Sequence, residues 1–165
     1  MDAQKIETMR AAGAILGEVL ESLLKYVKPG VSEIEIDSLA EKLIRERGGE
    51  PGFKKVPSYK HTICISTNDV VVHGVPTKKV LKEGDIVGID CGVFLNGYHT
   101  DMAETLRVSN TRGPAASHPR PTSSRHFVRS GRSSGAPRSA SPLDIDKIDK
   151  FLEVGKKALF AGIKE

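Results

Sequence analysis

Apolar residues recur at steps of three and four along the first part of the chain, from Ile6 to Val27. This spacing places them in one stripe along a helix of about six turns. The stripe ends at residues 28–30, where a cation, a proline and a glycine follow one another, which is a common way for a helix to stop. The pattern therefore predicts a long amphipathic helix that packs on a core.

A second apolar stripe of the same period occupies residues 36–44. Ser32 and Glu35 precede it with the spacing of a capping box, in which each residue satisfies an unpaired N–H group at the helix start. Gly48-Gly49 follows the stripe and should end the helix. The sequence thus predicts a second amphipathic helix, with Glu35 as a cap rather than a catalytic acid.

The pattern changes after the second helix. Residues 50–60 contain two prolines and a glycine, and predict a loop or an irregular strand. Residues 62–66 form a short β-branched run that indicates a buried strand. Residues 70–72 are three valines and predict another short strand, which would deliver His73 to the turn at residues 74–76.

Residues 84–108 have the pattern of a β-hairpin. They are rich in β-branched and aromatic side chains, and Asn96-Gly97 is the dipeptide that a two-residue type I′ turn prefers. Pairing outward from this turn makes Asp90 and Asp101 diagonal neighbours on one face of the sheet, with Cα atoms about 7–8 Å apart. The predicted fold class is α+β, with two N-terminal helices packed on an antiparallel sheet.

Two interpretations of the aspartate pair remain open from spacing alone. Acids on the exposed face of a hairpin are usually just hydrated. However, the rest of this hairpin is apolar, and two like charges side by side destabilise a sheet unless a cation lies between them. The alternative is therefore that Asp90 and Asp101 converge on metal ions, as carboxylates do in two-metal sites.

The composition fits a globular domain: 38% of the 165 residues are hydrophobic and 28% are charged. We find no apolar run long enough to span a bilayer and no signal peptide. The two cysteines, Cys64 and Cys91, are too few for a disulfide framework. We therefore expect a cytoplasmic protein without a membrane partner.

Residues 111–142 differ from the rest of the chain. They hold six arginines and no lysine or acid, so that within a net charge of +4 the remaining residues carry −2. Their serine, proline and arginine content predicts a disordered insertion of foreign origin, such as a locally shifted reading frame. Basic, serine-rich segments can bind RNA, but Phe127 is the only aromatic residue for stacking, so we expect nucleic-acid binding to be unlikely.

Residues 143–165 return to a helical pattern, with a faint repeat of the start of the chain. Lys147-Ile148-Asp149 mirrors Lys5-Ile6-Glu7, and Gly155 lies at the offset of Gly13. The predicted organisation is therefore a domain at 1–110, an insertion at 111–142 and a further helix at 143–165.

Two motifs, in the right order and spacing, resemble bacterial type I methionine aminopeptidase. One lies in the hairpin and the other upstream of it; they are Asp90-Cys91-Gly92 with Gly97-Tyr98 and Asp101, and residues 68–76. The resemblance extends from residue 1 to about 108 and resumes at about 145. It implies the pita-bread metallopeptidase fold, of which this chain would form the N-terminal half.

The resemblance implies hydrolytic removal of methionine from the N-termini of peptides and nascent chains, in some proximity to the ribosome. The cofactors would be two divalent metal ions, cobalt, manganese, iron or zinc. Asp90 and Asp101 match two of the family's metal ligands. Thr105 and His99 would then hydrogen-bond around the metals without coordinating them.

The resemblance also assigns a substrate site. His73 matches the histidine that contacts the substrate and assists proton transfer, a role that suits an imidazole near neutral pH. Tyr59 and Cys64 fall where the family lines its pocket for the methionine side chain, but from the sequence alone ordinary packing in the core is the favoured role for Cys64. Val56 stands where many relatives have an aromatic residue.

The family's remaining ligands, one histidine and two glutamates, have no counterpart in the sequence. Glu153 lies in the predicted last helix and does not match. Two carboxylates alone hold a divalent ion weakly. We therefore expect an incomplete enzyme with little activity, whose exposed apolar faces favour self-association. The alternatives are a non-catalytic or RNA-binding module that uses residues 111–142, and a prolidase- or creatinase-like relative.

Overall fold

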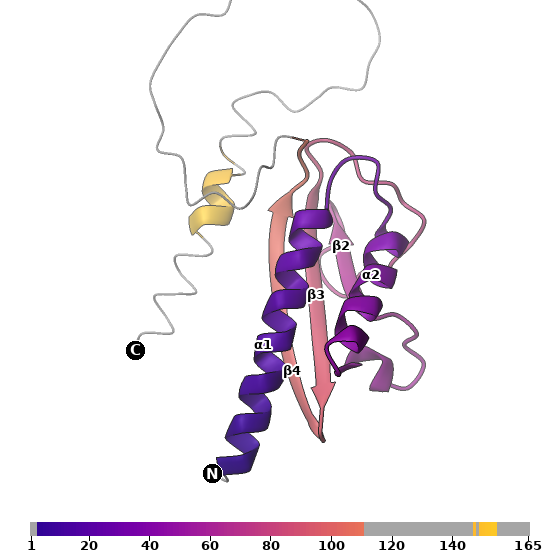
Figure 1. Cartoon of the computed structure of the whole chain (residues 1–165). Coiled ribbons are helices and arrows are strands. Elements are labelled where there is room, and N and C mark those ends of the chain that lie inside the picture. Colours follow the sequence, from indigo (N-terminus) through magenta and orange to yellow (C-terminus); the bar gives the residue numbers. More distant parts are fainter. Residues whose placement is uncertain (1–2, 111–146, 148, 155–165) are drawn as a thin grey trace, which may run out of the picture.

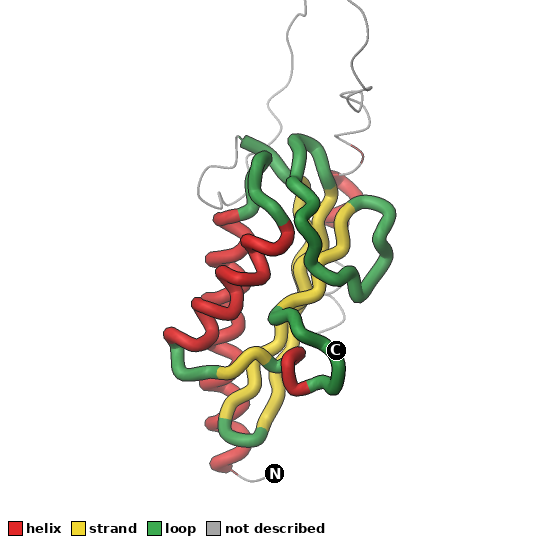
Figure 2. Tube along the Cα trace, turned by 90° about the vertical axis from the view of Figure 1, so that its right-hand side faces the viewer, coloured by secondary structure: helices red, strands yellow, loops and turns green. Residues whose placement is uncertain are grey.

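The computed structural model describes residues 3–110, 147 and 149–154. Two helices precede a four-stranded antiparallel sheet, and both helices cover the same face of that sheet (Figures 1 and 2). The elements, in chain order, are α1 (Ala3–Tyr26), α2 (Glu33–Glu46), β1 (Glu50–Pro51), the 3₁₀ turn η1 (Phe53–Lys55), β2 (Ile63–Thr67), β3 (Ile86–Leu95) and β4 (Tyr98–Arg107). The predicted α+β architecture is confirmed.

The core lies between the helices and the sheet. Its members come from the apolar stripes of α1 and α2 and from alternate residues of β3, and the most completely buried include Leu23, Ile36, Ile44, Val87, Ile89 and Val93. The first turns of α1 extend past this core, because Ile6 is only half-buried and Met9 is 36% exposed. Burial along α1 therefore begins at Ala12, beside the predicted stripe, and within the stripe at Leu16.

The predicted capping box at the start of α2 is present: the N–H group of Ser32 donates to the Glu35 carboxylate over 2.8 Å. The predicted hairpin is also confirmed, including its register, since Leu95 pairs with Tyr98 across the turn. Asn96 and Gly97 have φ values of 47° and 90°, as a type I′ turn requires.

The predicted strand at residues 70–72 is wrong. After β2, residues 68–79 form a loop, and Val71 is 87% exposed. A valine run favours a strand only where a neighbouring edge is free to pair. Here the N–H group of Ile65 on the outer edge of β2 is already taken by the carbonyl of Gly74. The three valines therefore lie on the surface.

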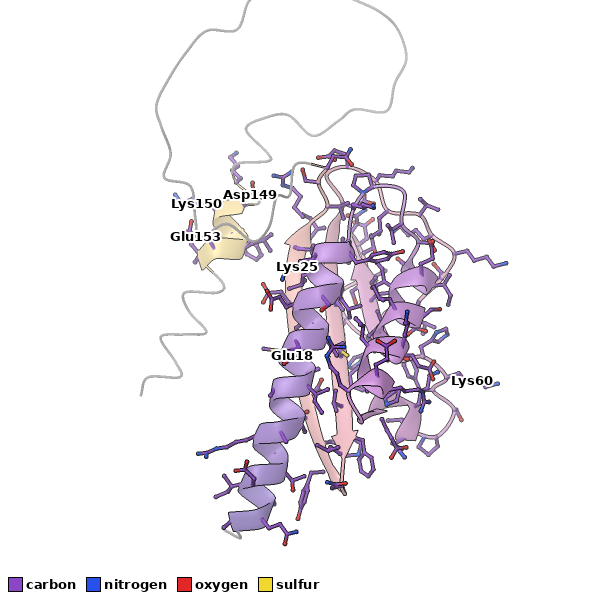
Figure 3. The ribbon with its side chains drawn as sticks, in the orientation of Figure 1. Glu18, Lys25, Lys60, Asp149, Lys150 and Glu153 are labelled. Atoms are coloured by element: carbon purple, nitrogen blue, oxygen red, sulfur yellow. The ribbon has the colours of Figure 1, made fainter. Side chains whose placement is uncertain are left out.

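The described part of the C-terminal region is a short helical segment at residues 149–154. Asp149 lies on this segment (Figure 3). Its carboxylate forms a bidentate ion pair with Arg107 at the end of β4, with distances of 2.9 and 3.0 Å. The insertion predicted at 111–142, and with it the RNA-binding interpretation, lies outside the described residues. Among the helices of the described ranges, none combines the length and the hydropathy of a membrane-spanning segment.

Candidate metal site

The candidate site lies on the face of the sheet that the helices leave open. The odd-numbered residues of β3 point into the core, so Asp90 points to the opposite face. Asp90 pairs with Ala103 and Asp101 with Gly92, which makes the two aspartates the diagonal neighbours that the sequence predicts. β2 is the other neighbour of β3, and Cys64 on β2 pairs directly with Asp90. The side chain of Cys64 therefore lies on the same face of the sheet.

The two carboxylates strongly influence one another. Partial burial, followed by the negative charge of Asp101 and a hydrogen bond with it, raises the pKa of Asp90 from 3.8 to about 6. The positive charge of His73 opposes this rise. A divalent cation would remove the unfavourable charge that raises this pKa, because an opposite charge stabilises the ionised carboxylate. The charge state of the pair thus fits a cation site.

The donor set of this site is limited to two carboxylates. Carboxylate oxygens suit hard divalent ions, so Asp90 and Asp101 fit the metal that the family resemblance implies. In the part of the chain that the structure describes, no group of three or more histidine, cysteine, aspartate or glutamate side chains could hold an ion. At this position the described residues therefore offer two carboxylate groups to an ion.

The loop after β2 carries His73, whose charge acts on Asp90. His73 is exposed and has a φ of 54°, an uncommon backbone conformation for a residue with a side chain. Its charge contributes to the pKa of Asp90, so the imidazole lies within electrostatic reach of the pair. The predicted substrate-binding and catalytic role of His73 remains a prediction.

Tyr59 and Cys64 form a fixed wall beside Asp90. The Tyr59 hydroxyl donates to the carbonyl oxygen of Ile63 over 2.8 Å and lies 3.3 Å from the Cys64 sulfur. Burial is the main cause that raises the pKa of both groups, so both stay neutral near pH 7. The wall is thus uncharged and polarizable, as a pocket for a thioether requires. Val56 is 55% exposed.

His99 and Thr105 lie on the same strand as Asp101, at alternate positions, and therefore on its face of the sheet. The His99 ring packs against Phe94, with ring centroids 4.8 Å apart. Thr105 pairs with Gly88 and is exposed. Their predicted contribution to the surroundings of a metal stays a prediction.

Sequence reasoning missed two buried carboxylates on α2, Glu33 and Asp37, which are 4% and 7% exposed. Asp37 accepts hydrogen bonds from the backbone N–H groups of Thr62 and Ile63, at 2.7 and 3.1 Å, and lies 3.0 Å from Nδ1 of His61. The available signal was their spacing, since acids at positions i and i+4 beside an apolar stripe share one helix face. That face here points at the two ends of β2.

Comparison with known proteins agrees with this geometry. Residues 7–119 match the metallopeptidase family M24. The chain is 48% identical over 106 residues to a methionine aminopeptidase of Clostridium perfringens, a match that covers 64% of this chain and 43% of the relative. It is 41% identical over 161 residues to a methionine aminopeptidase of Borreliella burgdorferi, covering 98% of this chain and 51% of the relative.

Solved structures show the same similarity. The methionine aminopeptidase from Rickettsia prowazekii superimposes with a TM-score of 0.64 at 33% identity, over 68% of this chain and 45% of that one. A prolidase from Pyrococcus furiosus gives a TM-score of 0.58 at 26% identity, over 65% and 30%. The chain spans about half the length of the curated relatives that it matches. These matches confirm the predicted half of a pita-bread fold. They favour the methionine aminopeptidase resemblance over the prolidase-like alternative. The chain belongs to metallopeptidase family M24.

Proposed function

We propose that this chain carries part of the active site of a metal-dependent aminopeptidase that removes methionine from the N-termini of peptides and nascent chains. The observation that carries the proposal is the convergence of Asp90 and Asp101 on the open face of the hairpin, with a raised pKa for Asp90. The named relatives support it, because methionine aminopeptidases are 41–48% identical to the matched residues.

Asp90 and Asp101 are the residues that would hold divalent metal, whether cobalt, manganese, iron or zinc. When bound, such an ion supplies Lewis-acid polarisation of a carbonyl group and lowers the pKa of a bound water. The two carboxylates supply four oxygen atoms and two negative charges, which would attract the cation and fix its place on the sheet. We expect them alone to bind such an ion weakly, because water must fill the remaining coordination positions.

The other residues of the site would bind and orient the peptide. His73 is exposed beside the pair, and its imidazole can donate a hydrogen bond to a substrate carbonyl or accept a proton near neutral pH. The wall of Tyr59 and Cys64 would contact the methionine side chain and exclude water from it. Thr105 and His99 would support the face around the metal.

The proposed partners follow from this substrate. A protein that acts on nascent chains would work in the cytoplasm and near the ribosome. The two cysteines are free thiols in the described residues, which suits a reducing compartment. The valines of the His73 loop, Val70, Val71 and Val72, are 45–87% exposed. Such an apolar surface favours self-association.

A two-step experiment tests the proposed function on the purified chain. Manganese binding is measured by calorimetry, and methionine release from a Met-Ala-Ser peptide is then measured with added manganese or cobalt. Asp101→Ala should weaken manganese binding at least tenfold, because it removes half of the donor set. Glu21→Ala is the matched control, since it removes one exposed carboxylate from α1 and should change neither readout.

Manganese binding by the parent chain without methionine release would support an incomplete site in a truncated relative. Methionine release that disappears in Asp101→Ala would support the full proposal. Manganese binding or methionine release that survives Asp101→Ala unchanged would refute the assignment of this aspartate and the site built on it.

A further inference from the structure

The loop that carries His73 is closed at its base by one side chain, Glu33. The loop leaves β2 at Thr67 and returns to the body of the domain at Thr77. One carboxylate oxygen of Glu33 accepts the hydroxyl of Thr67 over 2.7 Å. The other accepts both the N–H group and the hydroxyl of Thr77, over 3.0 and 2.7 Å. Glu33 thus joins the two stems of the loop.

Because Glu33 is buried, its carboxylate depends on the hydrogen bonds from both stems of the loop. The residue is only 4% exposed, and its three donors are neutral hydroxyl and amide groups. A buried carboxylate is tolerated only when its oxygens are fully hydrogen-bonded, and hydrogen bonds to an ionised acceptor are stronger than neutral ones. Displacing either threonine would leave the charge with fewer partners, so the Glu33 side chain couples the two stems. It acts beside the backbone contacts of each stem, which include the hydrogen bond from the Ile34 N–H group to the Thr77 carbonyl over 3.0 Å.

The tip of the loop depends on this closure. His73 is exposed, and the preceding Val71 is 87% exposed, so little packing holds them. The next residue, Gly74, accepts the N–H group of Ile65 over 2.8 Å and donates to the Ser66 hydroxyl over 3.3 Å. These contacts seat the loop on β2 between the two stems that Glu33 joins.

We propose that Glu33 is a positioning residue for His73: by closing the loop between Thr67 and Thr77, it holds Gly74 on β2 and thereby fixes the imidazole beside Asp90. The proposal rests on the proposed function insofar as His73 acts on the substrate. The arrangement itself is a property of the folded chain without metal or peptide.

Asp37 provides a matched control within the same helix. It lies four residues after Glu33, is similarly buried, and holds the opposite end of β2 through the N–H groups of Thr62 and Ile63. Removing either carboxylate strips buried donors of their acceptor and should reduce overall stability similarly. Only Glu33 touches the His73 loop, so the two variants separate positioning from general stabilisation.

Amide hydrogen exchange, followed by NMR on the full labelled chain, tests the proposal. In Glu33→Ala, the N–H groups of Gly74 and Ile65 should exchange about 10–100-fold faster relative to amides of the β3–β4 hairpin, as expected for lost hydrogen bonds to a charged group. The His73 ring signals should shift as well. In Asp37→Ala, exchange at Thr62 and Ile63 should accelerate while Gly74 and the His73 ring follow the hairpin.

Thr77→Val is a milder second variant, which keeps the test possible if Glu33→Ala does not fold. It removes from the exposed stem one hydroxyl, which donates to Glu33 and accepts the N–H group of Lys79 over 3.1 Å. It should accelerate exchange at Gly74 in the same direction by a smaller factor. The proposal is overturned if Gly74 and the His73 ring follow the hairpin in the folded Glu33 or Thr77 variants. Because neither metal nor peptide is used, a failed peptide assay would not affect this result.

Discussion

Replacing Gly74 with alanine should unseat the His73 loop, because no room exists for the added methyl group. Its Cβ would lie 2.1 Å from the carbonyl oxygen of Ile65 and 2.9 Å from the carbonyl carbon. A nonbonded carbon–oxygen contact needs about 3.3 Å, so the loop must retreat by roughly 1 Å. The retreat breaks the 2.8 Å hydrogen bond from the Ile65 N–H group to the Gly74 carbonyl.

The expected loss follows from these two effects. Overpacking against a backbone costs about 1–3 kcal/mol, and the lost hydrogen bond adds about 0.5–1.5 kcal/mol. Gly74→Ala should therefore lower the free energy of unfolding by about 2–4 kcal/mol, measured by urea denaturation with circular dichroism. With a denaturant slope of about 1–2 kcal/mol per molar, the midpoint should fall by about 1–4 M.

Gly13→Ala is the matched control for this change. Gly13 lies within α1, and nothing lies within 4 Å of a Cβ built on it. Alanine has the higher helix propensity, so this variant should gain about 0.5–1 kcal/mol. A Gly74→Ala variant whose free energy of unfolding stays within about 0.5 kcal/mol of the parent would refute the steric reasoning.

Two further predictions concern ionisation. The pKa of Asp90 is raised from 3.8 to about 6, so the folded chain binds this proton more tightly than the unfolded chain. The stability that the proton contributes is therefore present below pH 4 and is lost as pH rises through 6. After allowance for solvent screening, the Asp101→Asn variant should therefore be about 1 kcal/mol more stable than the parent at pH 7.5 and equally stable at pH 4, measured by urea denaturation without metal. Equal stability at both pH values would contradict repulsion between the two carboxylates. Burial, with the charges of Asp90, Asp101 and Asp37, raises the pKa of Cys91 to about 12, which lowers its thiolate fraction at pH 8 by about three orders of magnitude. Cys91 should thus resist alkylation in the folded chain and react fully in urea. The Cys91→Ser variant identifies any signal from Cys64, and rapid labelling of Cys91 in the folded chain would refute its burial.

The elements that could be predicted from the sequence are those specified by local chemistry. Asn96-Gly97 accepts positive φ at both positions, and this fixes the turn, the register and hence the diagonal aspartate pair. Ser32 and Glu35 likewise specify the start of α2 through their own hydrogen bonds. In both cases the residues that decide the structure are neighbours in the chain.

The features that could not be predicted depend on contacts between distant segments. The valines at 70–72 have strand propensity, but whether they pair depends on the edge of β2, which the carbonyl of Gly74 occupies. Glu33 and Asp37 resemble the ordinary acids of a helix's first turns. Their burial, and their bonds to residues more than 20 positions away, appear only when β2 is placed against α2.

The two faces of the sheet therefore respond to different kinds of substitution. The helix-covered face is held by apolar packing, so truncating a fully buried residue such as Leu23 would lower the stability of the whole domain. The open face takes its aspartates from the hairpin but its histidine from a loop held by hydrogen bonds to Glu33. Because backbone and carboxylate contacts orient that loop, His73 can be displaced relative to Asp90 while the core and the aspartate pair stay in place. The relative position of histidine and aspartates can thus change while the fold is retained, although the contacts that hold the loop also contribute to the stability of the domain.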